Sequence, residues 1–193
     1  FVGPQGENLG DILSESKNQK VVNEWFEKFE IPYEVSVQSN GPYHEIIMKP
    51  KKKNFVLSSR DIGLGYALSL TFFITALTQK NQIILIEEPE VHLHPKIQSR
   101  LMDLLLYSAY HNKNQFIIET HSENLLLRAQ RNLRNGFMHA GKKINVDVKD
   151  ILINNVTLDP DGSKVQEIKL SKTGEFKTHW KDGFFSERLD ELF

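Results

Sequence analysis

The chain has 193 residues, of which 39% are hydrophobic and 25% charged, which is enough apolar material for one folded domain or one lobe of a larger one. Its formal net charge of −1 excludes binding to nucleic acid or an anionic membrane through overall charge. The lack of cysteine excludes disulfides and thiolate metal sites and favours a cytoplasmic location. No signal-peptide pattern is visible. Because the chain begins at Phe1 and not at Met, we expect a piece of a longer protein.

The first part of the chain, residues 1–57, is expected to form a β-rich arm with one helix. Apolar residues that recur on one helical face predict the helix, and Pro32 ends it. Strict alternation on both sides of a Ser-Asn-Gly-Pro turn predicts a hairpin. The expected elements are a helix over residues 18–29, strands over 33–38 and 43–49, and a short strand over 54–57.

The middle part, residues 58–158, is expected to hold the core. Residues 62–79 carry no formal charge and approach the length of a membrane span, but their glycines and hydroxyl residues favour a buried core helix over 64–79. Two continuously apolar runs predict strands covered on both faces, and a helix between them predicts a parallel βαβ unit. The expected elements are strands at 83–86 and 116–118, a helix over 96–112, and a helix opened by a capping box at 120–123 and ended by Gly136.

Polar residues follow both predicted strands. Glu87 and Glu88 come directly after the first strand, and Thr120 and His121 after the second. Residues at the carboxyl ends of parallel strands form the working edge of such sheets, so we expect Glu88 and His121 to be neighbours. Alternation along a strand points adjacent side chains apart, which suits the two carboxylates to different tasks. In phosphoryl transfer, Glu87 would hold Mg²⁺ and Glu88 would position or deprotonate the attacking water.

The segment Glu87-Glu88-Pro89-Glu90-Val91-His92-Leu93-His94-Pro95 resembles the Walker B motif and D-loop of ABC-like ATPases, and is most similar to the AAA-type ATPases related to the OLD family, many of which act in phage defence. The segment 116–122 resembles the switch of that group, whose histidine contacts the γ-phosphate. The resemblance therefore implies ATP as the ligand, contact of His121 with the γ-phosphate, and nucleotide contact by His94. His121 would also lie at a helix N-terminus, where anions are favoured.

The segment Asp61-Ile62-Gly63-Leu64-Gly65 resembles the signature segment of the same group. The resemblance implies that backbone N–H groups at Gly63 and Gly65 contact the γ-phosphate bound by a second subunit of a homodimer. The chain departs from the group's pattern at Ala67 and Leu68, where the group usually has Ser and Gln. A tight turn that leads into a buried helix is the structural alternative.

The last part, residues 159–193, follows a predicted hairpin around Asp159-Pro160-Asp161-Gly162 and ends in an aromatic tail. Gly174-Glu175-Phe176 and residues 180–185 resemble a C-terminal domain of unknown function found in some of these ATPases. Packing of the aromatic side chains onto the rest of the chain is the structural alternative.

A working P-loop needs the pattern G-x-x-x-x-G-K-[ST], and no segment of this sequence matches it. The near match Gly136–Lys143 follows a predicted helix and ends in Lys, so we expect it to be a loop. In the family the P-loop lies upstream of the signature segment. We therefore expect the chain alone to lack useful ATPase activity.

Three alternatives remain at this point. A metal-dependent hydrolase would use Glu88, Glu90, His92 and His94 as ligands. A non-catalytic dimerisation module would retain the fold without hydrolysis. DNA binding would use Arg128, Arg131 and Arg134, with the lysines at 51–53.

The sequence thus predicts an α/β, ABC-type P-loop NTPase core that lacks its Walker A strand and carries a β-rich arm. ATP and Mg²⁺ are the expected cofactors. A second copy is the expected partner, an effector protein or DNA would be a further one, and no membrane is involved.

Overall fold

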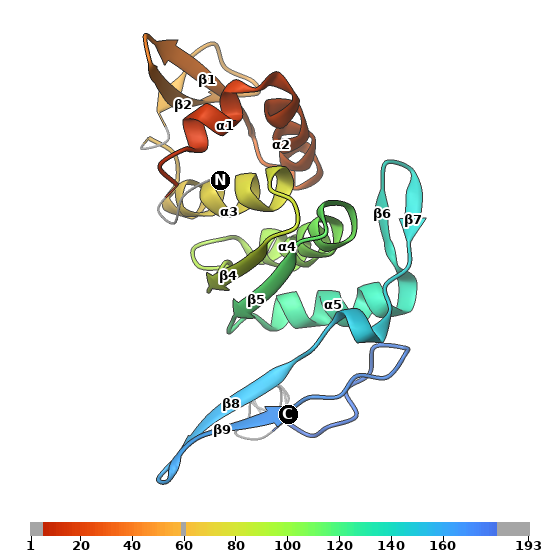
Figure 1. The fold of residues 1–193 in the computed structure, drawn as a ribbon. Coiled ribbons are helices and arrows are strands. Elements are labelled where there is room, and N and C mark those ends of the chain that lie inside the picture. Colours follow the sequence, from red (N-terminus) through yellow and green to blue (C-terminus); the bar gives the residue numbers. More distant parts are fainter. Residues whose placement is uncertain (1–5, 59–60, 181–193) are drawn as a thin grey trace. The chain divides into compact units, whose positions relative to one another are not determined.

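A computed structural model describes residues 6–58 and 61–180 (Figure 1). The chain divides into two compact units, Phe1–Ser122 and Glu123–Phe193.

The first unit begins with the β-rich arm that the sequence predicted. A short helix that was not predicted, α1, precedes the expected helix. The third strand was predicted over residues 54–57, and the structure has it at Leu57–Ser58. Asn23 joins helix to sheet, because its side chain donates to the carbonyl of Val35 at 2.9 Å and accepts from the N–H of Val35 at 2.8 Å. The antiparallel sheet has the order β1-β2-β3. The elements are α1 (Leu9–Ser14), α2 (Ser16–Lys28), β1 (Tyr33–Asn40), β2 (Tyr43–Pro50) and β3 (Leu57–Ser58).

Helix α3 (Leu64–Thr78) is the buried helix that the sequence predicted. Phe73 of α3 is buried and contacts two aromatic residues at the end of α2. Its ring centroid lies 5.8 Å from that of Phe26, in α2, and 5.1 Å from that of Phe29, which directly follows α2. Helices α2 and α3 therefore share one apolar core. None of the helices in the described part of the chain has both the length and the apolar character that crossing a bilayer requires.

The predicted parallel βαβ unit is confirmed. Strand β4 (Ile83–Glu87) pairs in parallel with β5 (Gln115–Glu119), and between them lie α4 (Pro95–Tyr107) and the π-helical turn η1 (Ser108–Asn112). Both arrows point the same way in Figure 1. The register runs from Ile83 opposite Gln115 to Glu87 opposite Glu119, so the two strands end level with each other.

Buried amide and hydroxyl groups hold the starts of these strands. Asn114 is buried; its side chain accepts from the N–H of Gln82 at 2.9 Å and donates to the carbonyl of Gln79 at 2.9 Å. Ser108 is fully buried and donates to the carbonyl of Ala76 at 2.6 Å. These bonds join the end of α3 to the starts of both strands. They therefore help to fix where β4 and β5 lie, and with them the carboxyl ends of the two strands.

The expectation that both faces of this sheet are covered is wrong. Ile83, Leu85 and Ile117 point to one face and are 64%, 72% and 62% exposed. The continuous apolar run is characteristic of a strand buried on both faces. Within the described residues, however, no segment covers the face that carries Ile83, Leu85 and Ile117, so this apolar face of the sheet is open to solvent.

The second unit contains α5 (Glu123–Asn135) and two hairpins, β6 (Phe137–His139) with β7 (Lys142–Ile144) and β8 (Asn154–Asp159) with β9 (Gly162–Glu167). Its core joins Leu126, Ile153 and Ile168, with Phe176 and Trp180 packed against it. The predicted capping box at 120–123 would make Thr120 the capping residue, but helix α5 begins at Glu123, so Ser122 directly precedes it. The predicted end of the helix is confirmed, because α5 stops at Asn135 and Gly136 follows with a positive φ.

Two sequence predictions fall within this unit. The near match to a P-loop, residues 136–143, forms the tight β6–β7 hairpin and offers no cradle at a helix N-terminus. The hairpin around residues 159–162 is confirmed as β8–β9. The tail residues Phe184, Phe185, Leu189, Leu192 and Phe193 lie outside the described part of the chain.

Candidate functional site

The candidate site begins where β4 ends. Glu87 is the last residue of β4, and Glu88 takes a left-handed conformation with φ of 44°. The N–H of Glu88 still donates to the carbonyl of Glu119 at 2.8 Å, so the loop after β4 stays attached to the end of β5. A positive φ is unfavourable for a residue with a side chain, and such conformations concentrate at functional sites. The backbone at Glu88 is therefore held in place by its surroundings.

Glu88 and His121 lie beside each other, as the sequence predicted. Oε1 of Glu88 is 3.5 Å from Nε2 of His121. Both side chains reach solvent, with 46% of Glu88 and 73% of His121 exposed. The two groups can therefore act on a ligand that approaches this edge of the sheet.

A cleft of about 560 Å³ opens at the same edge. Both Glu87 and Glu88 line it, together with Glu119 and residues of α3. The expected divergence of the two adjacent carboxylates does not separate them, because regular alternation ends at Glu87 and Glu88 has a turn conformation. The volume is within the range of small-molecule sites, about 300–1,000 Å³. The residues that line the cleft are Leu68, Ser69, Phe72, Ile86, Glu87, Glu88, Pro89, Val91 and Glu119.

The carboxylates of this cleft fit Mg²⁺ as ATPases use it. Mg²⁺ keeps several waters and takes one or two protein carboxylates, with phosphate oxygens completing its shell. Glu87, opposite Glu119 in the register, supplies such a carboxylate at the strand end.

The alternative of a metal-dependent hydrolase is wrong for the four residues proposed. Within residues 6–58 and 61–180, no three carboxylate or imidazole side chains converge as metal ligands. Glu90 is buried and bonded to Thr120, and His92 is exposed in a turn with φ of 60°. Their sequence proximity does not become spatial convergence, because the chain turns twice between Glu88 and Pro95.

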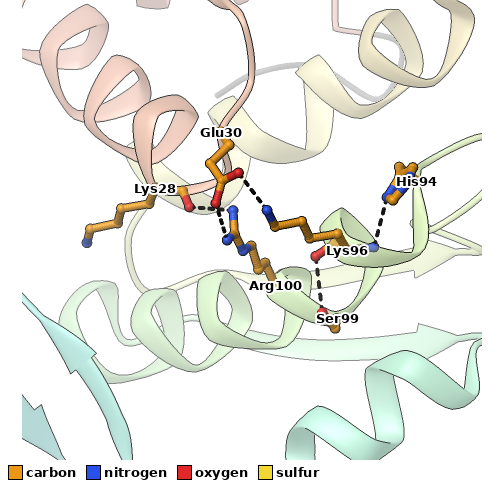
Figure 2. Close-up of polar contacts among 6 residues, drawn as sticks. All are labelled: Lys28, Glu30, His94, Lys96, Ser99 and Arg100. Atoms are coloured by element: carbon orange, nitrogen blue, oxygen red, sulfur yellow. Dashed lines mark hydrogen bonds and ion pairs between the residues drawn. The ribbon is translucent and has the colours of Figure 1, made fainter.

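His94, expected to contact nucleotide, caps helix α4. Its Nδ1 accepts from the N–H of Lys96 at 3.2 Å, as Figure 2 shows. Because Nδ1 is the acceptor, a neutral ring carries its proton on Nε2, which stays available as a donor. Pro95 follows at the first helical position, where its missing N–H costs nothing.

The same helix carries an ion-pair cluster that the sequence did not reveal. Figure 2 shows the carboxylate of Glu30 between Lys96 and Arg100. Lys96 Nζ lies 2.6 Å from Oε2 of Glu30, and Nη2 of Arg100 lies 2.7 Å from Oε1. Nη1 of Arg100 also donates to the carbonyl of Lys28 at 2.7 Å. Hydrogen bonds from Lys96 and then Arg100 lower the pKa of Glu30 to about 2.

Gly63 and Gly65 differ in what surrounds them. Gly65 is buried, and a Cβ there would lie 2.3 Å from the carbonyl oxygen of His92. Gly63 precedes α3, is exposed, and a Cβ there would meet nothing closer than 3.9 Å. Gly65 thus lets the start of α3 pack against the loop after β4, and this reason for a glycine is independent of phosphate.

Of the two departures from the signature pattern, at Ala67 and Leu68, the one at Leu68 bears on the cleft. Leu68 is 57% exposed and lines it. An apolar side chain therefore stands where the resemblance leads us to expect a polar one.

The basic residues expected to contact DNA do not form one uniform face. Arg131 and Arg134 are exposed on α5, whereas Arg128 is half-buried. Lys51, Lys52 and Lys53 are exposed in the turn after β2, in the other unit of the chain.

Comparison with known proteins identifies the family of this chain. The model of the family described as the AAA ATPase domain matches residues 6–126. A curated relative, the OLD nuclease of Thermus scotoductus, is 29% identical over 86 residues, which cover 42% of this chain and 16% of that protein. The chain thus spans about one sixth of that relative's length.

Two solved structures show the same fold. One belongs to work on ATP-driven dimerisation and DNA-stimulated activation of SMC ATPases; it has a TM-score of 0.59 at 18% identity and covers 92% of this chain and 91% of its own. The other is an Smc head bound to the C-terminal winged-helix domain of ScpA; it has a TM-score of 0.61 at 19% identity and covers 85% of this chain and 49% of its own. The fold is therefore α/β and resembles the SMC ATPase head, an ABC-type P-loop NTPase.

Proposed function

Because the chain belongs to the family of AAA ATPase domains, we propose that it binds ATP and supplies the hydrolytic groups of an ABC-like ATPase. The observation that carries the proposal is the 3.5 Å approach of Glu88 to His121 at the shared end of two parallel strands. A carboxylate and an imidazole at this edge are suited to act together on a phosphate and on the water that attacks it.

Each residue has a separate role in this proposal. Glu87 would hold Mg²⁺, which would supply positive charge to neutralise the phosphates. Glu88 orients the attacking water and accepts its proton, and Nε2 of His121 contacts the γ-phosphate. His94 donates from Nε2 to the nucleotide while Nδ1 keeps its bond to the helix start.

The proposal requires a P-loop, which another polypeptide segment supplies. The open sheet face formed by Ile83, Leu85 and Ile117 supports this, because parallel sheets are normally covered on both faces. We place the P-loop segment against that face, next to Glu87 and Glu119 at its polar end. The chain covers only 16% of the length of the OLD nuclease, which is consistent with a longer protein that carries a further segment.

A homodimer is the proposed working form. The exposed N-terminus of α3, at Gly63, would contact the γ-phosphate held by the second subunit through its backbone N–H groups, while the buried Gly65 would let α3 pack closely behind it. ATP-driven dimerisation described for SMC ATPases supports this arrangement. DNA or an effector protein is the proposed further partner, and the resemblance to OLD-related ATPases alone suggests a cytoplasmic phage-defence setting.

The test compares three proteins: the chain alone, the chain joined to its P-loop segment, and that joined protein with Glu88→Gln. We expect phosphate release only from the second, with a loss of about 10²–10⁴-fold in the third. Glu34→Gln is the matched control, because Glu34 is an exposed carboxylate on β1. Robust Mg²⁺-dependent turnover by the chain alone would contradict the proposal. ATP-induced dimerisation without turnover in the joined protein would instead identify a non-catalytic dimerisation module.

A further inference from the structure

Glu90 is a buried carboxylate that is hydrogen-bonded to the main chain of His121. It is 6% exposed, and it lies in the turn two residues after Glu88. Its Oε1 accepts two hydrogen bonds, from Oγ1 of Thr120 at 2.6 Å and from the N–H of His121 at 2.9 Å. One oxygen of Glu90 therefore holds both residues that directly follow β5.

This contact lies beyond the end of the sheet. The last main-chain bond between the two strand exits runs from the N–H of Glu88 to Glu119. Past that bond, the loop after β4 and the loop after β5 are joined by the side chain of Glu90. The pairing of the strands brings the two loops close, and Glu90 sets how the second loop leaves the sheet.

Further hydrogen bonds close the link into a ring. The N–H of Ser122 donates to Oγ1 of Thr120 at 3.0 Å, and Oγ of Ser122 donates to Oε1 of Gln98 at 3.1 Å. Nε2 of Gln98 donates back to the carbonyl of Leu93 at 3.0 Å. The ring includes α4 as well as both loops, so the main chain around His121 is held from two sides.

Burial of this carboxylate has a cost that packing does not explain. Oε2 of Glu90 is buried, and within the described residues it has no hydrogen-bond partner. Buried polar groups are unfavourable unless they are bonded, so an apolar side chain would serve a purely structural turn better. His121, in contrast, is 73% exposed, and packing against neighbours therefore does little to orient its ring.

We propose that Glu90 is a positioning residue that fixes the main chain of His121 so that its ring faces Glu88. The geometric part stands on the structure alone, whereas the consequence for turnover rests on the function proposed above. Glu90 itself takes no part in the chemistry: it acts through the N–H of His121 and the hydroxyl of Thr120.

The test uses Glu90→Gln and Glu90→Leu as a matched pair. Glutamine keeps an oxygen acceptor at the position of Oε1, whereas leucine of similar size removes it. In the full chain, we expect hydrogen exchange at the His121 amide to accelerate at least about tenfold with leucine, because its acceptor is lost. With glutamine it should stay within about twofold, as should the Glu88 amide in both variants.

A second measurement reports on the ring of His121. Glu88→Gln should shift the ring NMR signals of His121 in the wild-type and Glu90→Gln backgrounds but not in Glu90→Leu, where the ring no longer faces Glu88. In the protein joined to its P-loop segment, Glu90→Leu should lower kcat with KM nearly unchanged, and Glu90→Gln should retain activity. If the joined protein lacks turnover that depends on Glu88, the proposed function fails while exchange and ring signals still test Glu90.

Two results would overturn the inference. One is unchanged exchange and ring signals in Glu90→Leu. The other is loss of kcat in Glu90→Gln with His121 signals intact, because Glu90 would then act through its charge. If Glu90→Leu does not fold, Glu90→Asp replaces it: the shorter side chain keeps the charge but withdraws the acceptor from His121, and the same outcomes apply.

Discussion

The carboxylate of Glu88 and the ring of His121 meet at 3.5 Å although each follows a different strand. The parallel register brings them together, because β4 and β5 end level at Glu87 and Glu119. The bond from the N–H of Glu88 to Glu119 continues the pairing one residue further. The pairing of the strands therefore brings Glu88 and His121 together, and the exposure of their side chains leaves both accessible to a ligand.

His121→Gln should reduce turnover without destabilising the protein. In the ATPase joined to its P-loop segment, loss of the imidazole should lower kcat by about 10²-fold, the typical effect of removing one donor to a developing charge. The ring is largely exposed, so the melting temperature should stay the same. Steady-state kinetics and thermal melting check this. His179→Gln, at an exposed histidine of the other unit, is the control. Equal loss in both variants would contradict the role of His121.

Gly65→Ala should destabilise the chain, whereas Gly63→Ala should have little effect. Replacing a helical glycine by alanine ordinarily stabilises by about 0.5–1 kcal/mol. At Gly65 the new Cβ would lie 2.3 Å from the carbonyl oxygen of His92, so we expect a net loss of about 1–3 kcal/mol, typical of overpacking. At Gly63 the nearest atom is 3.9 Å away. Denaturant unfolding compares the two, and equal stability of both variants would show that His92 does not constrain α3.

Glu30→Gln should reduce stability in a pH-dependent way. The pKa of Glu30 is lowered to about 2 by hydrogen bonds from Lys96 and then Arg100, so its ionised form is favoured in the folded state. The stabilisation is present above the ordinary pKa of 4.5 and is lost as the pH falls through about 2. The difference between wild type and variant should therefore shrink across that range.

Denaturant unfolding at several pH values measures this difference. The effect should be modest at neutral pH and weaker at high salt, because all three side chains are accessible to solvent. Glu27→Gln, at an exposed carboxylate on α2, serves as the control. A Glu30→Gln difference that grows as the pH falls would contradict the assigned cause.

Polar substitution on the open sheet face should reduce self-association of the chain alone and should destabilise the protein joined to its P-loop segment. Leu85→Thr with Ile117→Thr keeps β-compatible side chains while removing apolar area from a register pair that faces solvent. We expect the chain alone to self-associate less, because exposed apolar patches promote association. Joined to its P-loop segment, the same variant should be less stable than wild type. Sedimentation and thermal melting measure these two effects. Unchanged stability of the joined protein would show that the segment does not cover this face.

Local sequence patterns determined most of the elements. The buried helix α3, the arm hairpin, the parallel pairing of β4 with β5 and the turn that ends α5 each depend on neighbouring residues, through periodicity, turn-forming residues and glycine. Even the approach of Glu88 to His121 could be predicted, because the strand–helix–strand order alone places both strand ends at one edge.

Only the tertiary structure decided the contacts between side chains that are far apart in the sequence. Glu90 bonds to Thr120 and His121, and Glu30 to Lys96 and Arg100, and each pair is separated by a long stretch of chain. The exposure of Leu85 and Ile117 likewise depends on what packs against the sheet, since the same apolar run suits a covered or an open face. Periodicity records which residues share a face of one element, whereas these contacts arise only when separate elements pack together.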